Sequence, residues 1–81
     1  MRADFSERFR KSYENAPLYI QRIFDKKLNF LLRSLHHPSL HAKKYDESRN
    51  IWQARATKTW RFYFRINSDI YELTDLIKHP K

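Results

Sequence analysis

The sequence predicts an α+β fold in which two N-terminal helices pack on one face of an antiparallel sheet of three to four strands. Apolar residues recur at a spacing near four up to Pro38 and at a spacing of two after it, which is the change expected where helices give way to strands. The chain of 81 residues is too short for two independent cores. We therefore expect a single domain over residues 1–81.

The first helix is predicted from a row of aromatic residues. Phe5, Phe9 and Tyr13 are spaced by four, which places their side chains on one side of a short helix. Asp4 and Ser6 are both suitable residues for capping its N-terminus.

The second helix carries the longest helical pattern in the chain. Pro17 stands where the helix begins, and His37-Pro38 ends it. Its apolar stripe consists of Leu18, Ile20, Ile23, Phe24, Leu28, Leu31, Leu32 and Leu35.

Strands are predicted in the second half of the chain. Residues 51–57, 60–67 and 70–77 alternate between apolar and polar side chains, and residues 43–45 are a candidate for a short fourth strand. The apolar side of this sheet consists of Trp60, Phe62, Phe64 and Ile66, continued by Tyr71, Leu73 and Ile77. The opposite side carries Arg55, Arg61, Tyr63 and Arg65.

The charge balance points to a polyanionic partner. Seventeen Lys and Arg residues against nine Asp and Glu residues give a formal net charge of +8. Nucleic acid, an acidic protein and an anionic membrane surface all meet this condition. The chain has no cysteine, which excludes disulfides and thiolate metal sites, and no apolar run approaches the roughly 20 residues that span a bilayer. We expect a soluble, cytoplasmic protein.

The polar side of the sheet is the first candidate site. Three arginines and a tyrosine on adjacent strands suit phosphates through forked hydrogen bonds and bases through stacking. An equally weighted interpretation is that the outer side of a half-exposed sheet is polar simply because it faces water.

The histidines suggest two further sites. His36, His37 and His41 are close in sequence, but no cysteine accompanies them and Pro38 interrupts the segment, so solvated loop histidines are favoured over a metal site. His79 lies at the end of the last strand, where a histidine can act as a general acid or base, or can be an incidental residue of a chain end.

The order of these motifs resembles the RelE/ParE toxin superfamily. The resemblance rests on two helices followed by residues 37–40 (HPSL), the pair 43–44 (KK), residues 51–55 (IWQAR) and 60–64 (WRFYF), and the ending His79-Pro80. It implies a curved antiparallel sheet with two helices on its convex side. It also implies a type II toxin that cleaves mRNA on the ribosome without a metal or other cofactor, and that an acidic antitoxin inhibits; no membrane or small-molecule partner is expected.

The resemblance also implies roles for individual residues. Arg55 and Arg61 match the sheet arginines that bind the scissile phosphate and its transition state. Lys43 and Lys44 match a basic pair that assists electrostatically or as a base, and His79 matches the general acid.

Two RNA-binding residues and two alternative functions complete these expectations. Tyr63 and Arg65 are assigned to RNA binding from the alternation of the strand rather than from the family pattern. ParE-like members share the fold but inhibit DNA gyrase without catalysis, so fold similarity does not decide function. An RNA- or ribosome-binding module without catalysis is the third possibility.

Overall fold

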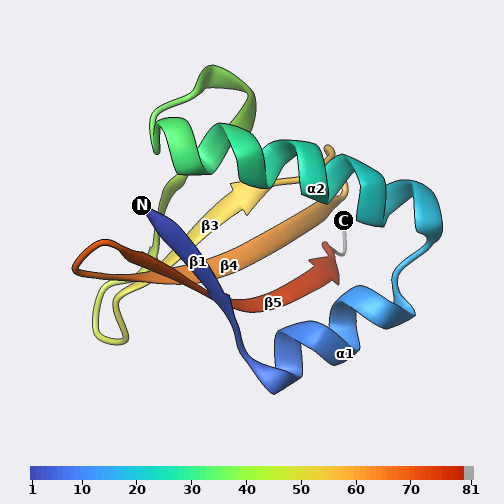
Figure 1. Cartoon of the computed structure of the whole chain (residues 1–81), viewed down its shortest axis with the longest axis horizontal. Coiled ribbons are helices and arrows are strands. Elements are labelled where there is room, and N and C mark those ends of the chain that lie inside the picture. The colour runs from blue at the N-terminus through green and yellow to red at the C-terminus, as the bar shows by residue number, and fades with distance from the viewer. Residues whose placement is uncertain (80–81) are drawn as a thin grey trace.

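Five strands and two α-helices form the protein in a computed structural model that describes residues 1–79 (Figure 1). In chain order the elements are β1 (Arg2–Phe5), α1 (Glu7–Asn15), α2 (Leu18–Arg33), the 3-10 turn η1 (Pro38–Leu40), β2 (Lys43–Asp46), β3 (Ile51–Arg55), β4 (Trp60–Asn67) and β5 (Ile70–Lys78). The α+β class and the two helices that precede the main strands are as predicted. No helix within residues 1–79 has the length and apolar character needed to cross a membrane.

The sheet has one more strand than the largest number predicted. Its order is β1-β5-β4-β3-β2, in which β1 runs parallel to β5 and the other neighbours are antiparallel. The sheet is therefore mixed. The additional strand, β1, has only four residues, which is too short a segment for alternation to be recognised.

Helix α1 begins at Glu7, two residues later than the aromatic spacing predicts. Phe5 is the last residue of β1, and Ser6 caps the helix by accepting a hydrogen bond from the Phe9 amide at 3.0 Å. Such a cap contributes about 1 kcal/mol. The three rings still form a row although Phe5 belongs to β1 and the other two to α1. The ring centroids are 5.4 Å apart for Phe5 and Phe9 and 6.1 Å apart for Phe9 and Tyr13.

Helix α2 follows Pro17 directly and crosses one face of the sheet (Figure 1). It ends at Arg33, earlier than predicted, where the Ser34 amide donates to the Phe30 carbonyl at 2.9 Å. Leu35 therefore lies beyond the helix. Leu18 was assigned to the apolar stripe but is 61% exposed, whereas Ile20 in the same turn of α2 is fully buried.

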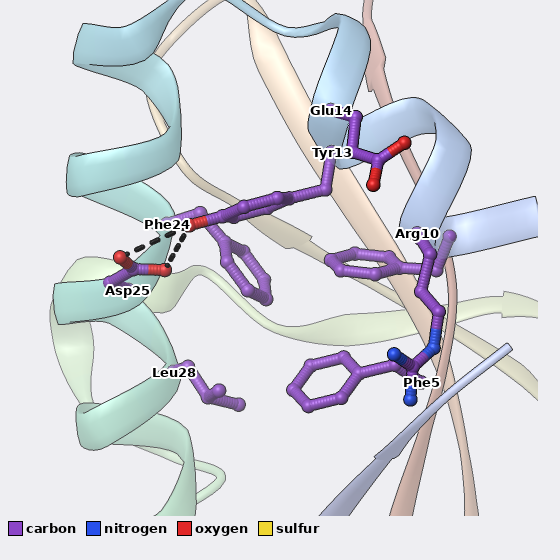
Figure 2. Close-up of a pocket in the computed structure, with 8 residues that line it drawn as sticks. Phe5, Arg10, Tyr13, Glu14, Phe24, Asp25 and Leu28 are labelled. Atoms are coloured by element: carbon purple, nitrogen blue, oxygen red, sulfur yellow. Dashed lines mark hydrogen bonds between the residues drawn. The ribbon is translucent and has the colours of Figure 1, made fainter. Parts of the chain in front are cut away.

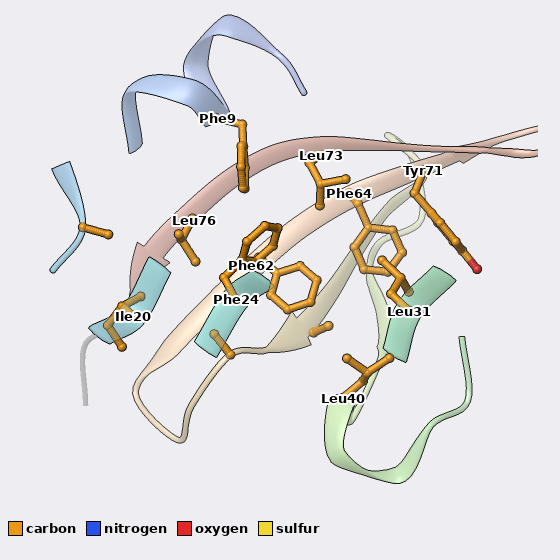
Figure 3. Packing of buried hydrophobic residues seen from close by; sticks show 13 residues of the cluster. Phe9, Ile20, Phe24, Leu31, Leu40, Phe62, Phe64, Tyr71, Leu73 and Leu76 are labelled. Carbon is orange, nitrogen blue, oxygen red and sulfur yellow. The ribbon is translucent and has the colours of Figure 1, made fainter. Parts of the chain in front are cut away.

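The core lies between α2 and the sheet (Figure 3). The Phe24 ring meets the Phe62 ring edge to face at 5.0 Å, and Phe64 meets Tyr71 in the same way at 5.6 Å. The largest fully buried side chains are Phe24, Phe62, Phe64, Ile20, Leu31, Leu40, Leu73 and Leu76.

A bulge in β5 changes which of its residues enter the core. Tyr63 is opposite Asp75 while Phe64 is opposite Leu73, so Thr74 is an extra residue in β5. The alternation shifts by one position at this point, and Leu76 is buried in place of the predicted Ile77. The prediction that Ile77 continues the apolar side is wrong for this reason.

Helix α1 lies against β5 beyond the point where β1 ends. β1 pairs with residues 70–73 of β5, and the Ser6 amide then donates to the Leu73 carbonyl at 3.0 Å. Beyond this point α1 contacts β5, where the Ser12 hydroxyl donates to Asp75 at 2.7 Å. Phe9 enters the core, whereas Arg8 reaches the side of the sheet that α2 leaves uncovered.

Candidate functional site

The predicted basic side of the sheet is the side opposite α2, and we call it the open face. In the strand pairing, Arg61 is opposite Arg55 on β3 and Ile77 on β5, and Tyr63 is opposite Gln53 and Asp75. The residues that line the open face from the strands are Lys43, Tyr45, Gln53, Arg55, Arg61, Tyr63, Arg65, Asp75 and Ile77.

Arg55 and Arg61 are direct cross-strand partners in β3 and β4. Arg55 also lines a shallow cavity together with Lys27 and His41. Nη2 of Arg61 donates to the Lys58 carbonyl at 3.3 Å, which fixes one end of the fork. Nε of Arg61 is buried and has no hydrogen-bond partner among residues 1–79. A buried donor without an acceptor costs free energy, and an anion would recover that cost only if the Arg61 side chain moved to expose this N–H.

Tyr63 is a buried phenol next to this pair. Burial, together with Tyr45 and Asp75, raises the pKa of Tyr63 above its ordinary value of 10.0, against an opposing effect of Arg61. The phenol therefore remains protonated at neutral pH. In that state it donates a hydrogen bond to phosphate or to a base but cannot act as a proton acceptor.

A cavity of about 310 Å³ opens on this face. It joins β2, β3, β4 and β5 to α1 and to the turn between β2 and β3. Its lining residues are Arg8, Tyr45, Arg49, Ile51, Tyr63, Arg65, Thr74, Asp75 and Ile77. The cavity thus combines arginines with aromatic and aliphatic side chains.

Asp75 anchors α1 to the wall of this cavity. Its Oδ1 accepts from the Ser12 hydroxyl at 2.7 Å and from the Leu76 amide at 2.9 Å, and its Oδ2 lies 3.1 Å from Nη2 of Arg8. The carboxylate is 8% exposed as a residue. These contacts explain how an acidic side chain is held in a basic surface.

Replacing Asp75 with alanine should therefore lower the free energy of unfolding by about 1–3 kcal/mol, because it leaves the Ser12 hydroxyl and the Leu76 amide without their acceptor. Urea denaturation measures the change. Asp4→Ala, which removes an exposed carboxylate from β1, is the control. Equal stabilities of the two variants would contradict this role.

The two lysines of the predicted basic pair lie on opposite sides of β2. Lys43 is exposed and opposite Gln53, on the open face. Lys44 is opposite Trp52, with Nζ 5.1 Å from the centroid of the Trp52 ring and 2.9 Å from Oδ1 of Asn50. Lys43 therefore shares the open face with Arg55 and Arg61, whereas Lys44 lies on the opposite side of β2.

His79 follows β5 and continues its pairing with the chain before β4. Its amide donates to the Thr59 carbonyl, and its side chain is exposed. Because Lys78 is opposite Trp60, alternation places His79 on the side of Arg61. Pro80, the second half of the predicted ending, lies outside the described residues.

The other histidines are not assembled into a metal site within residues 1–79. The His37 ring stacks on Phe30 at 4.0 Å with an interplanar angle of 3°, and its Nδ1 accepts from the Ser39 amide at 3.2 Å. His37 therefore fixes the turn that leads from α2 into β2.

A second cavity, of about 370 Å³, lies between β1, α1 and α2, away from the open face (Figure 2). The rings of Phe5, Phe9 and Tyr13 line it, and the Tyr13 hydroxyl donates to Asp25 at 2.9 Å. Its walls are mostly aromatic and aliphatic. Its lining therefore differs in chemistry from the arginine-rich open face.

Sequence reasoning missed several residues that line the open-face cavity. Tyr45 is two positions after Lys43 on the same strand, so alternation was a usable signal. Arg8 comes from α1 and Arg49 from a turn, and no local pattern places either of them there. Asp75 reaches the cavity only because of the bulge at Thr74.

Comparison with known proteins identifies the fold. No family model matches the chain, and no curated protein is similar to it in sequence. Among solved structures, a YoeB/ParE toxin from Agrobacterium tumefaciens superposes with a TM-score of 0.82 at 14% identity, covering 99% of this chain and 100% of that one. The YoeB-YefM toxin-antitoxin complex from Staphylococcus aureus gives 0.78 at 11% identity, covering 96% and 95%.

The isolated E. coli RelE toxin is also similar, with a TM-score of 0.76 at 16% identity over 98% of this chain and 84% of that one. The protein therefore has the RelE/ParE-like toxin fold, as the sequence motifs predict. At these identities the likeness concerns the fold, and the chemistry has to be argued from the open face.

Proposed function

We propose that the protein is a toxin of a type II toxin-antitoxin system and a metal-independent endoribonuclease that cleaves mRNA on the ribosome. The observation that carries the proposal is the cross-strand register of Arg55 and Arg61 on the open face. Two arginines whose Cα atoms are cross-strand partners can both reach the oxygens of one phosphodiester. The toxin fold of the structural neighbours supports the same class of function.

The proposed reaction uses the RNA itself as the nucleophile. The ribose 2′-hydroxyl loses its proton to a base and its oxygen attacks the adjacent phosphorus. The bond to the 5′-oxygen of the next nucleotide breaks, and that oxygen takes a proton from an acid. The products are a 2′,3′-cyclic phosphate and a 5′-hydroxyl end, and the protein supplies charge stabilisation and proton transfer.

The proton-transfer groups in this proposal are His79 and Lys43. His79 is the general acid, because it is exposed and alternation places it on the side of Arg61. Lys43 stabilises the developing negative charge or accepts the 2′-proton. Lys44 lies on the other side of β2, so we assign it the role of holding the strand through Trp52 rather than touching RNA.

Tyr63 and Arg65 bind the strand on either side of the scissile position. Tyr63 donates from a phenol that stays protonated at neutral pH, since burial raises its pKa. Nε of Arg65 donates to the Arg49 carbonyl at 3.2 Å, which orients its guanidinium along the open face. Both side chains are thereby held in place before RNA arrives.

An acidic antitoxin is the proposed inhibitor. A net charge of +8 favours a negatively charged segment that folds over the open face and covers the arginine pair. The Staphylococcus aureus neighbour was solved as a complex of toxin and antitoxin. Ribosomes as the site of action place the protein in the cytoplasm.

The experiment that tests this function is to induce the protein in growing cells and to map new 5′ ends of mRNA. Growth should stop, and the new ends should recur at a fixed position within codons. Arrested growth with intact messages would overturn the proposal in favour of a gyrase-inhibiting toxin. A supercoiling assay with purified DNA gyrase would then identify that target.

A further inference from the structure

The open face contains an exposed aromatic and aliphatic cluster that a purely electrostatic RNA surface does not need. Tyr45 is 60% exposed and Ile77 is 40% exposed. The Tyr45 ring meets the Tyr63 ring at a centroid distance of 5.1 Å and an angle of 69°. This edge-on contact with Tyr63 leaves much of the Tyr45 ring exposed, so a ligand can stack on it.

Positive charge surrounds this cluster. Arg8, Arg49 and Arg65 line the same cavity of about 310 Å³. Arg8 is paired with Asp75 at 3.1 Å and Arg49 with Asp46 at 3.8 Å, so Arg65 contributes most of the unpaired positive charge. The one carboxylate in its lining, Asp75, is engaged by the Ser12 hydroxyl and by Arg8. A ligand with a flat apolar ring and flanking negative charge matches this combination better than an acidic peptide, which would use the arginines but not the exposed ring.

The cluster lies next to the arginine pair. Ile77 is the cross-strand partner of Arg61, and Tyr63 is two residues further along β4. Two residues along a strand span about 6.6 Å, which is close to the length of one nucleotide in an extended strand. A base in the cavity would therefore belong to a nucleotide beside the one whose phosphate lies on Arg61.

We propose that this cavity is a base subsite in which an unpaired nucleobase stacks on Tyr45, while the surrounding arginines bind the adjacent phosphates. The inference rests on the proposed action on mRNA and extends it by placing one unpaired base of that strand against Tyr45. In a duplex the bases stack on one another and no base face is free to meet a protein ring. Stacking on an aromatic side chain also tolerates different bases.

The test uses an RNA that cannot be cleaved, so that binding is measured apart from catalysis. The probe is a single-stranded oligonucleotide that is 2′-O-methylated throughout and contains 2-aminopurine, whose fluorescence falls when it stacks. Wild-type protein should quench the probe. Tyr45→Ala should abolish the quenching and weaken binding by about tenfold to a hundredfold, as expected for the loss of one base–aromatic stack.

Two variants show whether the ring itself is responsible. Tyr45→Phe keeps the stacking surface and should bind and quench as the wild type does. Tyr19→Ala removes a tyrosine of α2 that is exposed to the same extent, 61%, and should have no effect. The matching duplex should bind more weakly and show no quenching.

Three results would overturn the base subsite: no quenching by the wild type, equal binding by Tyr45→Ala and wild type, or equal loss in Tyr45→Phe. None of them depends on cleavage. Quenching without any new mRNA ends in cells would leave the base subsite standing and remove the proposed nuclease activity.

Discussion

Replacing Arg61 with alanine should slow mRNA cleavage by roughly a hundredfold to a thousandfold, the loss found when one donor to a transition-state oxyanion is removed. Arg61 combines a fork fixed by the Lys58 carbonyl with a buried Nε that has no acceptor within the described chain. The hydrogen bond to Lys58 orients the guanidinium before the substrate binds. Cleavage of a message on purified ribosomes, followed in a single turnover, measures the rate.

Conservative and distant substitutions separate this role from a general effect of charge. Arg61→Lys keeps the positive charge but lacks the forked N–H donors of the guanidinium. It should therefore restore little of the activity that Arg61→Ala loses. Arg22→Ala removes an exposed arginine of α2 and should cleave at the wild-type rate. An Arg61→Ala variant as active as Arg22→Ala would mean that the arginine pair does not contact the scissile phosphate.

Replacing Phe24 with alanine should remove much of the stability of the protein. The Phe24 ring is 1% exposed and contacts the rings of Phe9, Tyr13 and Phe62. Truncating such a residue costs about 3–5 kcal/mol. Domains are stable by about 0.05–0.15 kcal/mol per residue, so this loss is a large part of the total. Urea denaturation followed by circular dichroism measures it.

The control for Phe24 lies on the same helix. Tyr19→Ala shortens an exposed side chain of α2 and should change the stability by less than about 0.5 kcal/mol. If Phe24→Ala were no less stable than Tyr19→Ala, the packing of α2 on the sheet would be wrong.

The sequence predicted the fold where the patterns are long. The bounds of β4, residues 60–67, are those that its alternation predicts, because eight residues with large aromatic groups on one side leave little ambiguity. β1 was missed because four residues carry too little pattern. Ile77 was placed on the wrong side because a bulge depends on strand pairing and on α1, and neither is visible in a local pattern.

The same distinction applies to the candidate site. Arg55 and Arg61 could be placed together because they belong to neighbouring strands of one hairpin, and alternation fixes their side. Lys43 and Lys44 were treated as a pair, although consecutive residues of a strand point to opposite sides. Arg8 could not have been predicted, since the packing of α1 at the sheet edge brings it to the cavity.

The most direct test of the nuclease is to compare the wild type with His79→Ala in growing cells, with His36→Ala as a control in an exposed loop histidine. New mRNA 5′ ends are mapped after induction. Wild type and His36→Ala should produce codon-phased cuts that are lost in His79→Ala, since a general acid contributes roughly 10²–10⁴-fold to the rate. Thermal stability of the three proteins should be similar. Codon-phased cuts of equal strength in His79→Ala would exclude His79 as the acid, and the absence of cuts in the wild type would contradict the ribonuclease itself.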